Sequence, residues 1–379
     1  MKILVLGAGL VGGPMAADLA NENRFSVTVA DINEESLASL KEKHPVSTIC
    51  RDLSDPSEVT KLLKNFDLVI NATPGFMGFR TFKAVIEAGR NIVDIAFFIE
   101  DPFVLDELAK KKNITAIMDC GVAPGMCNIL IGHVDQLLDE TEKVLYYVGG
   151  LPQVREWPYE YKAVFSPVDV IEEYTRPARY IENGKLVVRP ALSDPELIDF
   201  PGIGTLEAFN TDGLRSLANT IQAPDMKEKT LRYPGHIEKM AVLRETGFFG
   251  NDPLQIAGTW IRPVDFTARL LFPKWKLKKG EGDITVMIVM VEGKKSGKRF
   301  RYTYDLFDQY DPVTGIHSMA RTTGYTATVA LRMIAEGLFT VKGVIVPEFI
   351  GRHPDCVRFM LEGLKERGVI YHEKIEEIG

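Results

Sequence analysis

MKILVLGAGLVGGPMAADLANENRFSVTVAD, residues 1–31, is the stretch that decides the fold of this chain. It begins with a short apolar run, as a buried parallel strand requires. Gly7, Gly9 and Gly12 follow in G-x-G-x-x-G spacing, and a helical stretch then leads to a second apolar run that ends at Asp31. Strand, glycines, helix, strand and acid in this order predict the first βαβ unit of a dinucleotide-binding (Rossmann) sheet.

Each glycine of this motif has a physical task. Gly7 permits the tight turn out of the strand, Gly9 allows a pyrophosphate to approach the backbone, and Gly12 lets the helix pack close to the strand. The helix that follows offers N–H groups and partial positive charge to the phosphates. We therefore expect the cofactor to be bound here by Gly7, Gly9, Leu10, Val11 and Gly12.

Asp31 selects the dinucleotide. It ends the second strand, where an acid can accept hydrogen bonds from both ribose hydroxyls. A carboxylate there would repel a 2′-phosphate, and neither Ile32 nor Asn33 offers a positive charge. Lys41 and Lys43 are too far along the chain to supply one. The sequence therefore predicts NAD rather than NADP as the cofactor.

Strand–helix alternation continues for about 120 residues, which predicts a doubly wound parallel α/β sheet. We expect further strands at 46–49, 67–72, 91–94 and 114–118, and helices at 34–43, 57–65, 81–88 and 102–112. Ligands bind at the carboxyl ends of such strands. Those ends carry Asp94 and Asp119, and also the remaining residues that we assign to the cofactor: Asp52 and the turn Thr73, Pro74 and Gly75.

The pattern changes after Gly125. Longer strands with aromatic residues and period-two alternation are typical of antiparallel sheets, and KKSGK between two of them is a hairpin signal. We expect these strands at 143–149, 285–292 and 299–305, and long helices at 319–337 and 356–367. The expected domains are therefore an NAD-binding domain at 1–124, with C-terminal helices of about 318–379 packing back on it, and an α+β substrate-binding and dimerisation domain at 125–317.

Composition excludes several classes of function. The net charge is −7 and no basic block is present, so we expect no nucleic-acid partner. No apolar run is long enough to span a membrane, and the chain begins with a strand rather than a signal peptide. Four scattered cysteines are too few for a disulfide scaffold or a zinc site. We expect a cytoplasmic protein without a metal site or membrane contact, working as a homodimer or higher homo-oligomer.

Several polar clusters lie where turns are expected in the remaining chain. They are DCGVAPGMCN (119–128), YVGGLP (147–152), EEYTRPAR (172–179), NTDGLRS (210–216) and TLRYPGH (230–236). Taken singly, each is equally compatible with turn chemistry, a surface ion pair or a hydrogen-bonded histidine, because a motif needs its structural context.

Taken together and in this order, these motifs resemble the saccharopine dehydrogenase (saccharopine reductase) family. The resemblance runs from G-x-G-x-x-G through ATPGF (72–76) and the later clusters, and covers most of the chain. EEYTRPARYIENGK (172–185), with SMARTTGYTA (318–327) downstream, most resembles the L-lysine 6-dehydrogenase branch. The resemblance implies NAD-dependent oxidative deamination of L-lysine at the ε-amine, which yields 2-aminoadipate 6-semialdehyde, ammonia and NADH.

Such a reaction needs anchors for the two α-substituents of lysine. Arginine binds a carboxylate bidentately, so Arg215 is our first candidate for the α-carboxylate, with Arg176 and Arg232 as further candidates. Asp212 or Glu173 would hold the α-ammonium. The family's arginine lies slightly earlier in the NTDGLRS motif than Arg215, which leaves the carboxylate anchor open among the three.

The reacting amine must be neutral, although the free lysine side chain has a pKa of about 10.4. Asp94 and Asp119 end strands of the cofactor sheet and are candidates for orienting the amine or acting as the base. His236 is the candidate proton carrier near neutral pH.

Two other functions remain open at this point. A saccharopine or carboxynorspermidine dehydrogenase-type imine reductase would share the fold but needs a second carboxylate anchor. A non-catalytic NAD-binding family member is the other alternative, because a fold-level analogy does not establish activity.

Overall fold

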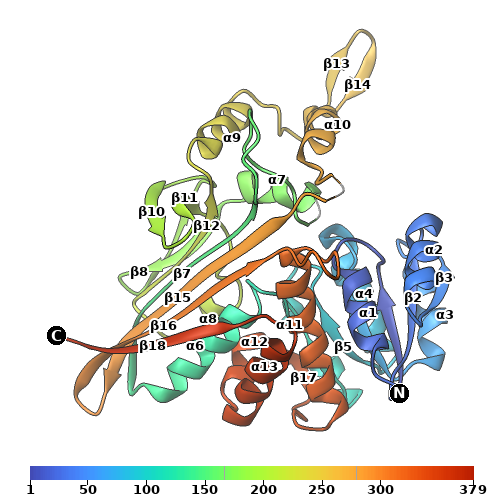
Figure 1. The fold of residues 1–379 in the computed structure, drawn as a ribbon, viewed down its shortest axis with the longest axis horizontal. Coiled ribbons are helices and arrows are strands. Elements are labelled where there is room, and N and C mark those ends of the chain that lie inside the picture. The colour runs from blue at the N-terminus through green and yellow to red at the C-terminus, as the bar shows by residue number, and fades with distance from the viewer. Residues whose placement is uncertain (166, 279) are drawn as a thin grey trace. The chain divides into compact units, whose positions relative to one another are not determined.

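The computed structural model describes residues 1–165, 167–278 and 280–379 (Figure 1). They divide into two compact units. The first unit is Met1–Leu137 with Ala320–Tyr371, and the second unit is Leu138–Met319 with His372–Gly379. The first boundary therefore falls after residue 137 rather than at 124. The end of the chain, expected among the helices of the first domain, contributes a strand to the second unit instead.

Within the described residues, the sheet of the first unit has seven parallel strands in the order β17-β6-β5-β4-β1-β2-β3. The chain reverses its direction of winding at β1, so the carboxyl ends of β1 and β4 flank the topological switch point where ligands bind. The strands are β1 Lys2–Leu6, β2 Ser26–Asp31, β3 Ser47–Cys50, β4 Leu68–Asn71, β5 Asn91–Asp94, β6 Thr115–Ile117 and β17 Gly343–Ile345. The first six match the predicted strands, whereas β17, contributed by the distant C-terminal segment, was not predicted.

The helices of the first unit follow the expected alternation, with one correction. The helix predicted at 81–88 begins at Gly75, because Pro74 occupies the N-cap position and the expected turn leads directly into the helix. The helices are α1 Gly12–Ala20, α2 Glu34–Lys43, α3 Pro56–Leu62, α4 Gly75–Glu87, α5 Asp106–Lys111, α6 Met126–Leu137, α11 Ser318–Ala335, α12 Pro347–Gly351 and α13 Pro354–Glu366, with 3₁₀ turns η1 Leu63–Asn65 and η2 Pro102–Leu105.

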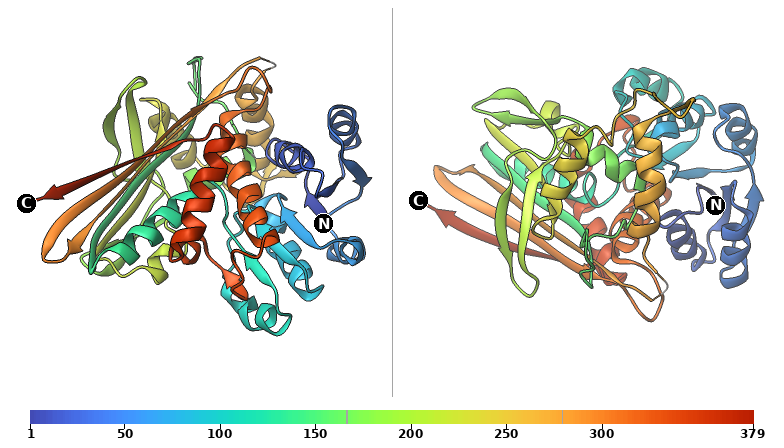
Figure 2. Two further views of the ribbon diagram at one scale, coloured as in Figure 1. Left: turned by 60° about the horizontal axis from the view of Figure 1, so that its bottom comes forward. Right: turned by 90° about the horizontal axis from the view of Figure 1, so that it is seen from above.

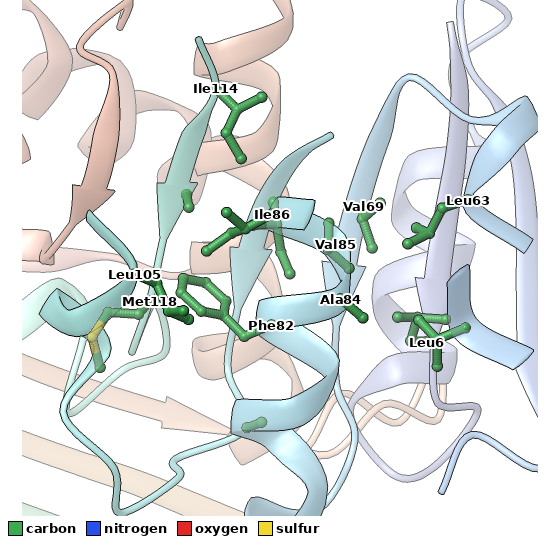
Figure 3. Close-up of a cluster of buried hydrophobic side chains, with 14 of the residues drawn as sticks. Leu6, Leu63, Val69, Phe82, Ala84, Val85, Ile86, Leu105, Ile114 and Met118 are labelled. Atoms are coloured by element: carbon green, nitrogen blue, oxygen red, sulfur yellow. The ribbon is translucent and has the colours of Figure 1, made fainter. Parts of the chain in front are cut away.

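A hydrophobic core between sheet and helices fixes the carboxyl ends of the strands. Phe82 and Ile86 of α4 are buried in one cluster with Val69 of β4 and Leu105, and Figure 3 shows Phe82 beside Leu105. The spacing of 82 and 86 puts both side chains on one face of the helix. Burying each such side chain is worth about 1.5–3 kcal/mol, so this face holds α4 and its N-terminal turn against the sheet.

The C-terminal helices pack on the helix that follows the glycine motif. Asp18 of α1 accepts a hydrogen bond from Arg332 Nη1 at 2.7 Å and from Arg367 Nε at 2.8 Å. A Cβ on Gly324 of α11 would lie 2.9 Å from Met15 Cγ, so a larger residue there would require the Met15 side chain to shift. The segment 320–371 thereby packs against α1.

The second unit is built on a mixed sheet in the order β10-β11-β12-β7-β15-β16-β18, with β8 and β9 attached through β12. The strands are β7 Glu140–Pro152, β8 Ala178–Glu182, β9 Lys185–Arg189, β10 Glu196–Phe200, β11 Gly204–Asn210, β12 Asp225–Arg232, β15 Asp283–Lys295, β16 Lys298–Gln309 and β18 Tyr371–Ile378. Figure 2 shows the long β15–β16 hairpin predicted from KKSGK.

The sequence prediction was incomplete for this sheet. β7 runs antiparallel to β15 but parallel to β12, so the sheet is not purely antiparallel. The strands β8–β12 were not predicted. β9 and most of β10 are solvent-exposed and lack a clear apolar alternation, which removes the signal on which a strand prediction depends.

The helices and the remaining hairpin of the second unit complete the fold. They are α7 Pro167–Thr175, α8 Leu217–Thr220, α9 His236–Glu245 and α10 Pro263–Trp275, with the separate hairpin β13 Leu254–Ile256 and β14 Thr259–Ile261 at the top of Figure 1. An aromatic core including Tyr174, Phe209 and Trp275 packs α7, α9 and α10 together. Among the described residues, no helix combines the length and apolarity that crossing a bilayer requires.

Candidate functional site

The glycine motif has the geometry that a pyrophosphate requires. Gly7 adopts a φ of 107°, and a Cβ on Gly12 would lie 2.1 Å from the Gly7 carbonyl oxygen, so neither position accepts another residue without a backbone shift. A Cβ on Gly9 would meet nothing within 4 Å. Gly9 is therefore dispensable for packing, and its lack of a side chain leaves room for a ligand above the start of α1.

Asp31 lies at the end of β2 and closes the motif. Its carboxylate accepts hydrogen bonds from the Ala8 amide at 2.6 Å and from the Asn33 amide at 2.8 Å. A carboxylate has about four acceptor positions, so two remain for ribose hydroxyls. The remaining acceptor positions of Asp31 and the open space at Gly9 fit a dinucleotide.

The other residues assigned to the cofactor surround this motif. Leu10 is exposed and Val11 forms the N-cap of α1. Thr73 donates from its hydroxyl to Asn71 Oδ1 at 2.8 Å, ahead of Pro74 and Gly75 at the start of α4. These residues lie at the carboxyl ends of β1 and β4, on either side of the switch point.

Asp52 has a local structural contact. It follows β3 and accepts from the Ser54 amide at 2.9 Å, and hydrogen bonding from Ser54 lowers the pKa of the Asp52 carboxyl. It is solvent-exposed and therefore stays ionised at neutral pH.

The two aspartates proposed as catalytic differ in their surroundings. Asp94 is fully buried, and its two oxygens accept from Asn71 Nδ2 at 2.6 Å and from the Ala96 amide at 2.8 Å. These bonds tie together the ends of β4 and β5. Asp119 follows β6 in a left-handed conformation with a φ of 51°, an uncommon state for a non-glycine residue.

The second unit holds a buried ion pair on one face of β12. Arg232 is 2% exposed and donates through Nη2 to Glu173 Oε2, whose side chain is 21% exposed. Burial raises the pKa of the Glu173 carboxyl, while Arg232 acts in the opposite direction. Glu173 lies on α7 and Arg232 at the end of β12, so packing of the helix on the sheet creates this pair.

Tyrosines enclose the Arg232 guanidinium. Its carbon lies 4.6 Å from the centre of the Tyr161 ring, within cation–π range, and its Nε donates to the Tyr174 hydroxyl at 3.3 Å. Burial raises the pKa of Tyr174 to about 12, despite the opposing charge of Arg232. Both tyrosines therefore remain neutral hydroxyls at physiological pH.

His236 does not fit the role of proton carrier that the sequence suggested. It is 1% exposed, and its ring nitrogens contact the Tyr159 carbonyl oxygen at 2.8 Å and the Tyr174 hydroxyl at 3.0 Å. Burial, and secondarily the charge of Arg232, lowers the pKa of His236 to about 3. The imidazole is therefore neutral near pH 7 and is held as part of the aromatic core.

The remaining substrate candidates have separate partners. Asp212 accepts a bidentate pair from Arg179, Nε and Nη2, at 2.8 Å each, so its carboxylate is already matched by a guanidinium. Arg176 contacts Glu172 at 3.5 Å. Arg215 is half-buried with a φ of 51°. The structure thus brings Glu173, Arg232 and His236 together, and places Asp212 in a second ion pair.

Sequence reasoning missed four residues of this region: Tyr161, Tyr174, Arg179 and Glu228. A signal for one of them exists, since alternate residues of DMKEKTLR in β12 share a face. Glu228, Thr230 and Arg232 are buried on that face. Because lysines alternate with these residues in the sequence, the buried face of β12 could not be told from that of an exposed charged strand.

The fold and the two sites define a two-unit α/β protein that binds a dinucleotide at a Rossmann switch point. The family described as "Saccharopine dehydrogenase C-terminal domain" matches residues 121–369, and "Saccharopine dehydrogenase NADP binding domain" matches residues 3–117. The chain therefore belongs to the saccharopine dehydrogenase family, as the sequence motifs indicated.

Curated relatives support this membership at low identity. Alpha-aminoadipic semialdehyde synthase of Bos taurus is 25% identical over 98% of this chain and 47% of the relative. The chain thus spans about half the length of such relatives. Saccharopine dehydrogenase [NADP(+), L-glutamate-forming] of Pyricularia oryzae is 24% identical over 91% of this chain and 93% of the relative.

Solved structures share the fold. Saccharopine dehydrogenase (L-Glu forming) from Saccharomyces cerevisiae superposes with a TM-score of 0.82 at 20% identity, covering 99% of both chains. Homospermidine synthase from Legionella pneumophila, solved in complex with NAD, gives a TM-score of 0.67 at 13% identity and covers 98% of this chain and 91% of the other. The α/β fold with its second mixed-sheet unit is thereby confirmed.

Proposed function

We propose that this protein is an NAD-dependent dehydrogenase that deaminates L-lysine at its ε-amine. Lysine, NAD⁺ and water would give 2-aminoadipate 6-semialdehyde, ammonia, NADH and a proton. The observation that supports NAD as the cofactor is the Asp31 carboxylate at the end of β2. The substrate half is supported by the Arg232–Glu173 pair and by the sequence resemblance to lysine dehydrogenases.

The choice of NAD follows from charge. A 2′-phosphate beside the ribose would approach Asp31, whose oxygens are fixed by the amides of Ala8 and Asn33 and so cannot turn away without loss of these bonds. Arg51, after β3, is the nearby cation that would favour NADP. Arg51 is exposed, and its Nε lies 3.7 Å from Glu58 Oε2, so the Glu58 carboxylate already offsets part of its charge.

Arg232 and Glu173 are complementary to the zwitterionic end of an amino acid. Three donors of Arg232 have partners, in Tyr174, Glu173 and the Leu231 carbonyl, whereas a guanidinium has five N–H groups. A substrate carboxylate would take the remaining donors, and the substrate ammonium would face Glu173. Because the pair is buried, the two interactions would be weakly screened.

Bound NAD⁺ would supply the hydride acceptor for the ε-carbon. The residues of this chain must orient the neutral amine and then assist addition of water to the substrate imine. We assign the orienting role to Asp119, since both oxygens of Asp94 are engaged in holding β4 to β5. The strained φ of Asp119 is of the kind that accumulates at functional sites.

A substrate screen tests this proposal. Purified protein is incubated with NAD or NADP and with lysine, ornithine, saccharopine or carboxynorspermidine, while reduced cofactor and ammonia are measured. Equal amounts of NADH and ammonia from lysine alone are the expected result. Turnover of saccharopine with release of glutamate, and none of lysine, would overturn the proposal.

The second candidate is oxidation of saccharopine to L-glutamate and the same semialdehyde. The names of the relatives from Pyricularia oryzae and Saccharomyces cerevisiae favour it. Saccharopine carries two more carboxylates than lysine, both on its glutamate arm, so this function needs further cationic side chains, and Arg176 near Glu173 is one candidate. The same screen distinguishes the two functions by the product released.

A further inference from the structure

A carboxyl group without a cationic partner lies beneath the NTDGLRS motif. Glu228 on β12 is 4% exposed. Its Oε2 accepts from the Thr211 hydroxyl and from the Gly213 amide at 3.1 Å, and Thr230 approaches its Oε1 at 3.4 Å. In the part of the chain that the structure describes, Glu228 forms no ion pair.

The 211–215 loop is the lid over this carboxyl. A Cβ on Gly213 would lie 2.4 Å from Glu228 Cδ and 2.5 Å from Oε2, so a larger residue at position 213 would have to displace the Glu228 side chain or the loop. The Gly213 carbonyl oxygen is held from the other side by the Tyr146 hydroxyl at 2.7 Å. The same loop carries Asp212 and Arg215, two of the predicted substrate residues.

We propose that Glu228 is a positioning residue: its buried carboxyl, bonded to Thr211 and Gly213, holds the 211–215 loop in the shape that presents Arg215 and lets Asp212 pair with Arg179. Where this involves a substrate, it rests on the function proposed above. The contacts to the loop itself do not depend on that function.

The charges around Glu228 determine which form of the acid holds the loop. Glu173 on α7 lies near enough to disfavour a second negative charge. Arg232, on the same face of β12, is committed to Glu173, and Arg179 on β8 is committed to Asp212. Tyr146 on β7 bonds to Gly213 rather than to the acid.

Burial is the largest cause that raises the pKa of Glu228 to about 7, and Glu173 adds to it, whereas the bonds from Thr211 and Gly213 act in the opposite direction. Opening the loop would expose the carboxyl and return its pKa towards the ordinary value of about 4.3. By linkage, the protonated acid favours the closed loop, and raising the pH above 7 favours opening.

Hydrogen exchange of the loop amides tests the proposal without any substrate. Exchange of peptides covering 211–215 is measured at pH 6.5 and 8.5 and corrected for the intrinsic pH dependence. In the natural protein, protection should fall about fourfold over this interval, because ionisation of one carboxyl with a pKa of about 7 in the closed loop drives opening. In Glu228→Gln, which keeps the size of the acid without its charge, protection should not change with pH.

Glu207→Gln is the matched control, since Glu207 on the neighbouring β11 also accepts from a loop amide, that of Gly235, at 3.0 Å. It should behave as the natural protein does. Gly213→Ala should lower protection at both pH values, because its Cβ would displace the loop from the acid. Equal pH dependence in the natural protein and Glu228→Gln would overturn the proposal.

Kinetics with lysine extend the test to the site. The ratio of KM in the natural protein to KM in Glu228→Gln should rise at least about threefold between pH 6.5 and 8.5, while kcat changes less. A constant ratio would show that the loop does not present substrate residues. If no amine is turned over at all, the proposed function fails, whereas the exchange result still decides the role of Glu228.

Discussion

The dinucleotide site and the Arg232–Glu173 site are built in different ways. The first comes from one continuous stretch of about thirty residues, in which Gly12 packs against the Gly7 carbonyl and Asp31 accepts from the Ala8 amide. The second joins α7 to the end of β12, segments separated in sequence by more than fifty residues. A local site can be predicted from spacing, whereas a site between distant segments depends on how helix and sheet pack.

Arg232→Ala is expected to have the largest effect and to act on the second site alone. It leaves Glu173 without its partner, and breaking a buried ion pair in this way costs about 3–5 kcal/mol. We expect kcat/KM for lysine to fall at least about 100-fold, with the Kd for NAD unchanged. Arg262→Ala, which breaks an exposed pair with Asp265, is the control. If the KM for lysine in Arg232→Ala equals that of the natural protein, Arg232 does not bind the substrate.

Gly9→Ala and Gly12→Ala separate packing from ligand binding in the first site. Gly12→Ala should lower Tm by about 5 °C or more, because its Cβ would collide with the Gly7 carbonyl. Gly9→Ala should leave Tm within about 1 °C of the natural value. It should nevertheless raise the Kd for NAD at least about tenfold, by occupying the path of the pyrophosphate. Unchanged NAD affinity in Gly9→Ala would show that the cofactor lies elsewhere.

Asp31→Asn tests the choice of dinucleotide. The amide keeps an acceptor for the Ala8 N–H but removes the charge that repels a 2′-phosphate. The ratio of Kd for NADP to Kd for NAD should fall about tenfold, which corresponds to about 1.4 kcal/mol. Glu35→Gln, which removes an exposed charge nearby on α2, should not alter this ratio. Tighter binding of NADP than of NAD in the natural protein would contradict our assignment directly.

His236→Gln should have the smallest effect on catalysis, with kcat/KM within about fivefold of the natural value. Because the pKa of His236 is about 3 in the folded protein and about 6.5 when unfolded, its contribution to stability is present above pH 6.5. That contribution is lost as the pH falls towards 3. Thermal melts at pH 7 and pH 4.5 should therefore show a smaller acid-induced loss in His236→Gln. A fall in kcat/KM of more than about 100-fold in His236→Gln would instead indicate that His236 carries a proton in the reaction.

The sequence was most informative where interactions are local. The first six strands of the first sheet and the long β15–β16 hairpin follow from apolar periodicity and turn residues. β17 could not be predicted, since three apolar residues far from the rest of the sheet carry no signal of their own. The parallel pairing of β7 with β12 likewise depends on the path of the chain between them.

The sequence by itself determined the dinucleotide-binding βαβ unit, the likeness to the saccharopine dehydrogenase family and the acid at position 31. These depend on residue spacing along one segment, which backbone geometry converts directly into positions. Only the tertiary structure decided that Arg232 pairs with Glu173, that Arg179 occupies Asp212 and that His236 is buried and neutral. Burial and partners from distant segments set the charge and the pKa of these groups, and neither can be obtained from spacing.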